Sequence, residues 1–406
     1  MKTYRHLYEK MLDPLTVSRC ALDAAEGKTK RPEVQRFFTN FDENYEYVIK
    51  CTSDPNYNPC ENNRHEIIDG ANHKQREIEK PRFCPEQILH HMIIHAFKPV
   101  LLNGLYEQVY GCLPPVPYRK VCSDGEKILF KKFGPHAAIK QLTKWIHVNK
   151  KIFIAETDIH HAYGSVHIAT LVRQMKEVIK DERWLALTYK FLHYNPEDPE
   201  SENEYGLVLG HYTSPWFFNF YLKKFDHFMA AQPEIKYLRF ADNMYIIGSN
   251  KRKVHKALAV MKDYLKQNLK LELNSSTQIY RFEYMTKYGK VAGRAVNALG
   301  AVIHYNRVTL RKNILMRMRR KANRIHAKGL NVTWHDGASM FSRLAWIRAT
   351  DTYTYYAKNI KSKINTKRLK RKVRNHSKQI QPIAIERRRI INDGLENSAR
   401  LAAYQA

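Results

Sequence analysis

The sequence predicts an α+β fold, because stretches with helical spacing of apolar residues alternate with short apolar runs typical of buried strands. At 406 residues and 44% hydrophobic content, the chain is long and apolar enough to bury a sizeable core. The strongest strand is KKIFIAETD, rich in Ile and Phe and ending on Asp158. Residues 235–250 form two apolar runs around Asp-Asn, the pattern of a tight β-hairpin. Helical spacing is clearest at residues 85–110, 165–180, 214–231 and 251–270.

The remaining segments follow in chain order. Residues 1–149 are predicted to be mainly helical and polar, interrupted by a loop at 53–63 where Pro and Asn cluster. Further strands are expected at LELN (271–274) and over residues 296–310. From Arg311 onward the chain is predicted to be helical and basic.

The charge of the chain indicates a polyanionic partner. The 69 Lys and Arg residues outnumber 39 Asp and Glu residues, which gives a formal charge of +30. Nucleic acid is the usual partner of such a protein. No apolar run is long enough to span a bilayer, and MKTYRHLYEK lacks the apolar core of a signal peptide, so we expect no membrane partner and a cytoplasmic location.

Two blocks near the C-terminal end concentrate this charge. Residues 311–334 contain eight Lys and Arg, residues 358–374 contain nine, and neither block contains an acid. Such blocks repel themselves unless an anion lies against them. The six cysteines form no CxxC pair and are expected to be reduced thiols, although Cys51 and Cys60 bracket a loop and are the pair that a metal would use.

Two acids mark a possible catalytic site. Asp158 ends a predicted buried strand, and Asp242 lies at a predicted hairpin tip. Taken singly, each has a structural explanation, since a strand-end Asp often caps the next helix and Asp-Asn favours a turn. Between them lies GLVLGHYTSP, a glycine-containing segment that enters an aromatic helix and that a substrate could cross.

The order of these motifs resembles that of reverse transcriptases. DIHHAY is similar to the first palm motif of that family, GHYTSP to the second and FADN to the third. LELNSSTQI resembles the fourth motif, and VNALGAVIH the primer grip. The resemblance implies a right-hand polymerase with fingers and N-terminal helices at 1–150, an antiparallel palm backed by helices at 151–310, a basic helical thumb at 311–376 and a tail at 377–406.

The resemblance also implies roles for particular residues. Asp158, Asp242 and the adjacent Ile159 are expected to bind two Mg²⁺ ions, for which Mn²⁺ is a possible substitute, because carboxylates that bridge two ions support phosphoryl transfer. The other positions implied to contact the nucleotide are Arg76 and Lys74 at the triphosphate, Tyr163 as the gate that excludes a ribose 2'-OH, and Gly210 and Ser214 in the second motif.

The chain departs from the family pattern at positions 243 and 276, among others. Asn243 stands where the family usually has a second Asp, which removes a negative charge beside the expected metals, and it is kept among the expected catalytic residues. Ser276 stands where a Lys commonly assists the leaving pyrophosphate, and a hydroxyl is a poor acid at neutral pH. Both changes are expected to slow catalysis.

Two functions therefore remain open. The first is an RNA-templated DNA polymerase of the bacterial or phage type, related to diversity-generating, defence or group II intron-like enzymes, that uses an RNA template, a DNA or RNA primer and dNTPs. The second is a catalytically weakened relative that binds a structured RNA or a partner polymerase as a scaffold. An accessory protein is compatible with both.

Overall fold

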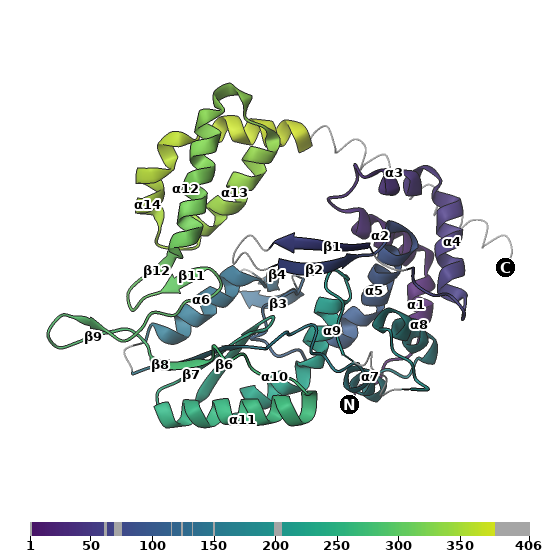
Figure 1. Cartoon of the computed structure of the whole chain (residues 1–406), viewed down its shortest axis with the longest axis horizontal. Helices are drawn as coiled ribbons and strands as arrows, with labels where there is room; N and C mark the ends of the chain where they lie inside the picture. Colours follow the sequence, from purple (N-terminus) through teal and green to yellow (C-terminus); the bar gives the residue numbers. More distant parts are fainter. Residues whose placement is uncertain are drawn as a thin grey trace.

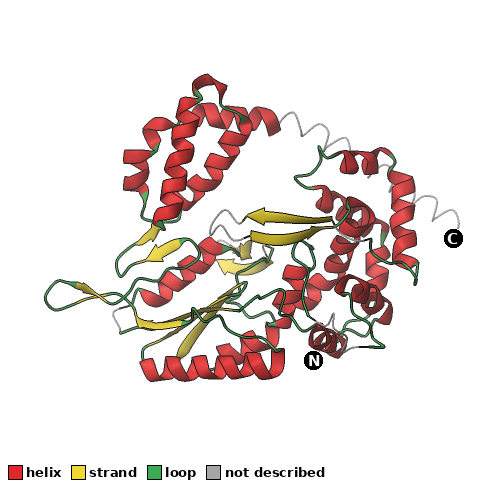
Figure 2. Ribbon diagram, viewed as in Figure 1, coloured by secondary structure: helices red, strands yellow, loops and turns green. Residues whose placement is uncertain are grey.

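The computed structural model describes residues 2–60, 63–68, 75–114, 116–122, 125–131, 133–148, 151–198 and 205–377. The described residues form a mixed α and β fold around an antiparallel four-stranded sheet (Figures 1 and 2). The strand order in this sheet is β6–β7–β5–β8, with bounds β5 Phe153–Asp158, β6 Ile235–Phe240, β7 Asn243–Gly248 and β8 Gln278–Arg281.

Helices cover both faces of this sheet because successive strand residues point to opposite sides. In β7, Met244 packs into the core with α11 (Lys251–Leu269), whereas Tyr245 packs into a second core with α6 (Pro135–Ile146). Figure 1 shows α11 on one side of the sheet and α6 on the other. The sheet is therefore buried on both faces, and its free surface is reduced to the strand ends.

The N-terminal part is a group of helices with two β-hairpins. The helices are α1 Leu7–Leu12, α2 Pro14–Ala25, α3 Pro32–Thr39, α4 Phe41–Ser53 and α5 Ile88–Leu102. The hairpin strands are β1 Asn63–Ile68, β2 Gln75–Lys80, β3 Val116–Cys122 and β4 Gly125–Lys131. The prediction of a mainly helical region over residues 1–149 is thus wrong for these four strands.

The middle of the chain completes the layers around the sheet. Its helices are α7 Ile168–Val178, α8 Glu182–Leu192, α9 Ser214–Tyr221 and α10 Lys223–Ala230. Short strand pairs follow, namely β9 Tyr284–Met285 with β10 Val291–Ala292, and β11 Ala301–Ile303 with β12 Val308–Leu310. The expected strand at LELN is not formed: Leu273 makes only an isolated bridge to Ile159, and β8 occupies the place beside β5.

The C-terminal helices form a separate small core. They are α12 Lys312–Ala327, α13 Trp334–Arg348 and α14 Tyr353–Asn359, and residues 366–377 are also helical. Thr333 and Asp336 form a capping box that starts α13. Met318, Ile325 and Met340 are buried between these helices, so the Lys and Arg residues of α12 are left mainly at its surface. Figure 1 shows α12 beside α13 and α14.

Candidate active site

The pairing of β5 with β7 brings the two predicted acids together. Asp158, the last residue of β5, is directly opposite Asn243, the first residue of β7, so Asp242 in the preceding turn lies beside it. The backbone N–H of Ile159 donates to the carbonyl oxygen of Asp242 at 3.4 Å. Burial raises the pKa of Asp242, and the negative charge of Asp158 raises it further. The two carboxylates therefore share one region of negative potential, which favours a bound cation.

Neutral donors contact both carboxylates. Asn274 Nδ2 donates to Asp158 Oδ2 at 3.2 Å, and Ser276 Oγ donates to Asp158 Oδ1 at 3.2 Å. On the other acid, Asn243 Nδ2 donates to Asp242 Oδ1 at 2.9 Å. The two positions at which the sequence departs from the family pattern, 243 and 276, thus both contact the acids directly.

A buried ion pair supports the turn that carries Asp242. Arg239 and Asp226 are both 0% exposed, and Arg239 Nε and Nη2 donate to the two carboxylate oxygens at 2.8 and 2.7 Å. Arg239 Nη1 donates to the carbonyl oxygen of Ala241 at 3.0 Å and to Asn219 Oδ1 at 3.0 Å. Burial alone would lower the pKa of Arg239, but the Asp226 carboxylate holds it above its ordinary value. The guanidinium therefore stays charged and is bonded to the main chain of Ala241, the residue before Asp242.

A second segment fixes the turn from outside the hairpin. Asn219 Nδ2 donates to the carbonyl oxygen of Gly111 at 3.0 Å. A Cβ atom at Gly111 would lie 2.3 Å from the backbone nitrogen of Ala241, so only glycine fits. Ala241 itself has a φ of 51°, in the left-handed region. Arg239, Asp226 and Gly111 were not among the predicted site residues; the only signal for them in the sequence is a pair of charged residues, Asp226 and Arg239, within otherwise apolar segments.

The predicted nucleotide-binding residues fall into three situations. Tyr163 packs its ring on Phe218 with centroids 5.0 Å apart, and burial raises its pKa, so the phenol is neutral and held in place. Arg76 lies on β2 with an exposed side chain. Its positive charge partly offsets the rise in the pKa of Asp242, so Arg76 lies within electrostatic range of that acid. Lys74 lies outside the described residues.

Gly210 lies in the loop before α9, and Ser214 is the first residue of that helix. Gly210 has a φ of +106°, and a Cβ atom there would lie 2.0 Å from the carbonyl oxygen of Glu79 on β2. The Glu79 N–H donates to the carbonyl oxygen of Leu209 at 2.8 Å. Ser214 is 3% exposed and its hydroxyl donates to the carbonyl oxygen of Val208 at 2.6 Å, so it stabilises the loop, and its contact with a substrate stays a prediction.

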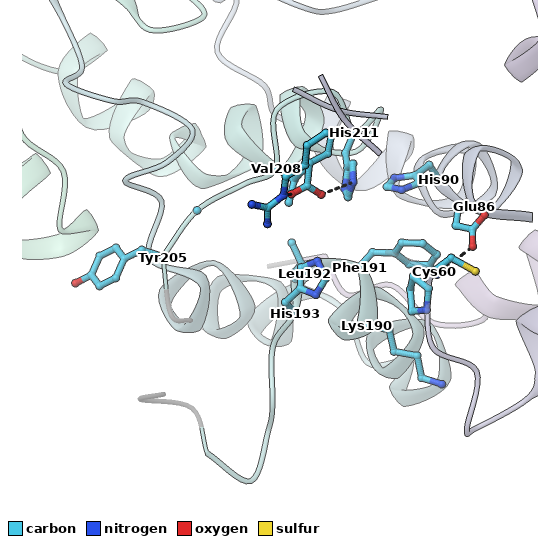
Figure 3. Close-up of a pocket in the computed structure, with 14 residues that line it drawn as sticks. Cys60, Glu86, His90, Lys190, Phe191, Leu192, His193, Tyr205, Val208 and His211 are labelled. Carbon is cyan, nitrogen blue, oxygen red and sulfur yellow. Dashed lines mark hydrogen bonds and ion pairs between the residues drawn. The ribbon is translucent and has the colours of Figure 1, made fainter. Parts of the chain in front are cut away.

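A cavity of about 700 Å³ lies next to this loop (Figure 3). His90 and His211 form part of its wall, with ring centroids 4.6 Å apart. Burial lowers the pKa of His211 to about 4, and lowers that of His90 as well, so both rings are neutral at pH 7. Glu86, also in the wall, is 1% exposed. The lining also includes Arg64, Lys190 and Glu79, so two cations and two acids face the cavity, which lacks the excess positive charge that a triphosphate needs.

The acids fit magnesium that arrives with a nucleotide. Within the described part of the chain, no group of three or more His, Cys, Asp and Glu side chains is arranged to hold a metal ion. Mg²⁺ is usually held by one or two carboxylates together with substrate phosphates, and Asp158 and Asp242 meet that requirement. Ile159 has a buried apolar side chain, 2% exposed, so only its main-chain carbonyl oxygen can act as a ligand.

The sheet with two acids at one end, together with a strongly basic helical part, is the combination expected of a nucleic acid polymerase. Residues 131–303 match the family described as reverse transcriptase (RNA-dependent DNA polymerase). This segment, which includes both acids, is therefore similar to reverse transcriptases.

Other comparisons add less. A solved structure described as apo telomerase from Candida tropicalis, truncated from the C-terminal domain, is similar at 11% sequence identity with a TM-score of 0.40. The similarity covers 66% of this chain and 59% of that one, so the chain spans about three fifths of the length of this structure. Comparison with curated proteins yields no match. In the described residues, every helix is too short or too polar to cross a lipid bilayer.

Proposed function

We propose that the protein is an RNA-templated DNA polymerase that adds dNTPs to a primer 3'-hydroxyl by two-metal phosphoryl transfer. The observation that carries this proposal is the antiparallel pairing of β5 and β7, which brings Asp158 and Asp242 together at one end of the sheet. The segment that matches the reverse transcriptase family supports it, because both acids lie within that segment.

In this proposal the parts of the chain act as a right hand. Residues 1–150 are the fingers with N-terminal helices, 151–310 the palm, 311–376 the thumb and 377–406 a tail. The basic surface of α12 would lie along the phosphates of the template–primer duplex, which gives affinity without sequence preference. The biological setting we favour is a bacterial or phage element, either diversity-generating or defensive.

Each site residue has a distinct task in the reaction. Asp158 and Asp242, with the carbonyl oxygen of Ile159, would hold two Mg²⁺ ions, which when bound lower the pKa of the 3'-hydroxyl and neutralise the leaving pyrophosphate. Arg76, with Lys74, would bind the triphosphate through charge-assisted hydrogen bonds. Tyr163, held against Phe218, would exclude a ribose 2'-hydroxyl.

A specific observation favours a second candidate, a catalytically weakened RNA-binding scaffold. Asn243 replaces an acid and donates a hydrogen bond to Asp242, and Ser276 donates to Asp158. Both contacts occupy carboxylate oxygens that a metal would need, and neither residue adds a negative charge. Metal affinity would therefore be lower than with a third carboxylate.

The decisive experiment is primer extension with dNTPs on a primed RNA template. Asp158→Asn and Asp242→Asn should each abolish incorporation while RNA binding persists, because the amides keep the shape but lose the charge that holds the ions. Asp263→Asn, on the exposed face of α11, is the matched control and should leave incorporation unchanged. Wild-type protein that binds RNA but incorporates nothing, with Mg²⁺ or with Mn²⁺, would favour the scaffold.

A further inference from the structure

A narrow β-ribbon projects from the sheet and has no role in the proposed reaction. It runs from Arg281 to Arg294 and contains β9 and β10, which pair through only two residue pairs. Figure 1 shows it extending outward beyond β8, on the side away from the N-terminal helices. We call this segment, residues 281–294, the arm.

The root of the arm is fixed to the body of the protein. Phe282 is 6% exposed and belongs to the core shared with α6. The Arg294 N–H donates to the carbonyl oxygen of Arg281 at 3.0 Å, and the Glu283 N–H donates to that of Arg294 at 3.1 Å. A Cβ atom at Gly293 would lie 2.5 Å from the carbonyl oxygen of Phe282, so the two chains cross in close contact there. The direction of the arm is thus set by its root.

The tip is ordered by its own hydrogen bonds yet fully presented to solvent. The Thr286 N–H donates to the carbonyl oxygen of Lys290 at 2.8 Å, and the Gly289 N–H donates to that of Thr286 at 3.0 Å. Tyr288 is 77% exposed, Val291 52% and Met285 46%. An isolated two-stranded ribbon is marginally stable in water, and an exposed apolar ribbon invites association. Both properties are accounted for if a ligand covers the tip.

The chemistry of the tip specifies the ligand. The tip, residues 284–292, includes Lys287 and Lys290 and no acidic residue. Lys287 Nζ lies over the Tyr288 ring, 5.0 Å from its centroid. Cations beside an exposed aromatic ring match a phosphate backbone with an accessible base, because phosphates pair with ammonium groups and bases stack on aromatic faces.

The surface continues from the arm toward the sheet. A cavity of about 500 Å³ at the root is lined in part by Lys151, Arg281 and Tyr284, and the Arg281 guanidinium lies 3.4 Å from the centroid of the Tyr284 ring. A cation lies over an aromatic ring both in the wall of this cavity, which Glu283 also lines, and at the tip.

We propose that the arm is a second nucleic-acid contact, outside the copying site, in which Lys287 and Lys290 bind phosphates and Tyr288 stacks on a base. The occupant is an RNA with unpaired bases, because a duplex keeps its bases stacked in its interior; the part of this RNA in copying rests on the proposed function. The contact itself rests only on the arm.

The test uses the full chain with two changes at the tip. In one variant Thr286–Lys290 is replaced by Asn-Gly, which closes the Met285–Val291 pair with a two-residue hairpin turn and leaves the root intact. In the other, Lys287→Gln and Lys290→Gln are combined with Tyr288→Ser. The control removes the same charge from the outer face of α11 by Lys262→Gln with Lys266→Gln.

Binding is measured by fluorescence anisotropy at several salt concentrations, with a long RNA–DNA duplex, a hairpin-rich RNA and a short primer–template. Both arm variants should bind the hairpin-rich RNA about tenfold more weakly than the control at roughly 0.15 M salt, and the plot of log affinity against log salt should be shallower by about 1.8, because each phosphate contact contributes roughly 0.9. A loss confined to the RNA–DNA duplex would overturn the proposal, because a duplex offers Tyr288 no unpaired base.

Arm variants that match the α11 control in affinity and salt dependence for both long ligands would overturn the proposal. Primer extension on the short primer–template is measured in parallel with the same proteins. If the wild-type protein incorporates nothing while the arm variants still lose binding, the proposed polymerase fails and the arm proposal stands. If the wild-type protein extends the primer while the arm variants bind like the control, the arm proposal fails and the polymerase stands.

Discussion

Breaking the buried pair between Arg239 and Asp226 should disable the turn that carries Asp242. In Asp226→Asn the guanidinium stays buried, keeps its bonds to Asn219 Oδ1 and Ala241 O, and loses its only charged acceptor among its hydrogen-bond partners. Leaving one buried charge without its partner costs about 3–5 kcal/mol. Since a folded domain is stable by only about 5–15 kcal/mol, this is a large fraction of the total.

A double variant separates stability from positioning. Arg239→Met with Asp226→Leu replaces the pair by apolar side chains of similar length, an exchange that is often neutral or stabilising. The Tyr237 hydroxyl, which donates to Asp226 at 3.0 Å, then loses its acceptor, so we expect a residual loss of about 1–3 kcal/mol. Incorporation should nevertheless stay low and require more Mg²⁺, because the Ala241 carbonyl has lost the donor that holds the turn.

The assays are urea denaturation for the free energy of unfolding and dNTP incorporation over a Mg²⁺ titration. Lys224→Met, which removes an exposed ion pair with Glu177, is the control and should cost less than about 1 kcal/mol. The reasoning is refuted if Asp226→Asn is as stable as this control. It is also refuted if the double variant copies at the wild-type rate and Mg²⁺ concentration.

Three further outcomes are expected. Asn243→Asp should lower the Mg²⁺ concentration at half-maximal incorporation, because it adds a ligand charge and removes the donor to Asp242 Oδ1; an unchanged Mg²⁺ curve would contradict this. Tyr163→Val should admit ribonucleotides, which gel analysis of products made with rNTPs would detect, and continued rejection would place the sugar gate elsewhere. In α13, burial alone would raise the pKa of Asp336, but hydrogen bonds from Lys321 and Lys328 hold it well below its ordinary value. The stabilisation by Asp336 is therefore present above the unfolded pKa of about 3.9 and is lost as pH falls through the lower folded value. Asp336→Asn should therefore have a lower melting temperature than the wild-type protein at pH 6, and this difference should shrink below about pH 4. A difference that stays constant across that range would count against the ion pairs.

The central strands could be predicted because a strand that is buried on both faces consists mainly of apolar residues. KKIFIAETD and the runs around Asp242 are apolar on both sides, as a sheet covered on both faces requires, and they appear as β5, β6 and β7. In contrast, β1 and β2 have mostly exposed or half-buried side chains, so no apolar alternation marked them. The apolar run at 85–110 ends as a helix at Leu102, where Gly104 takes a left-handed φ of +68°.

Only the two acids of the candidate site could be predicted from the sequence. A strand-end acid and a hairpin-tip acid are visible as local patterns, and the β5–β7 register then places them side by side. The support of the hairpin turn depends on residues 108–111 and 219–226, which approach it only in the folded chain. No local spacing relates Gly111 to Ala241, so that contact could not have been inferred from one sequence.

The junction between β2 and the loop before α9 has a mechanical consequence. Because the Glu79 N–H is bonded to the Leu209 carbonyl and Gly210 leaves no space for a side chain, strand and loop cannot slide past each other. If the β1–β2 hairpin moves when a nucleotide binds, the loop before α9 must move with it. Arg76 and Gly210 would therefore reach an incoming nucleotide in a single movement rather than one after the other.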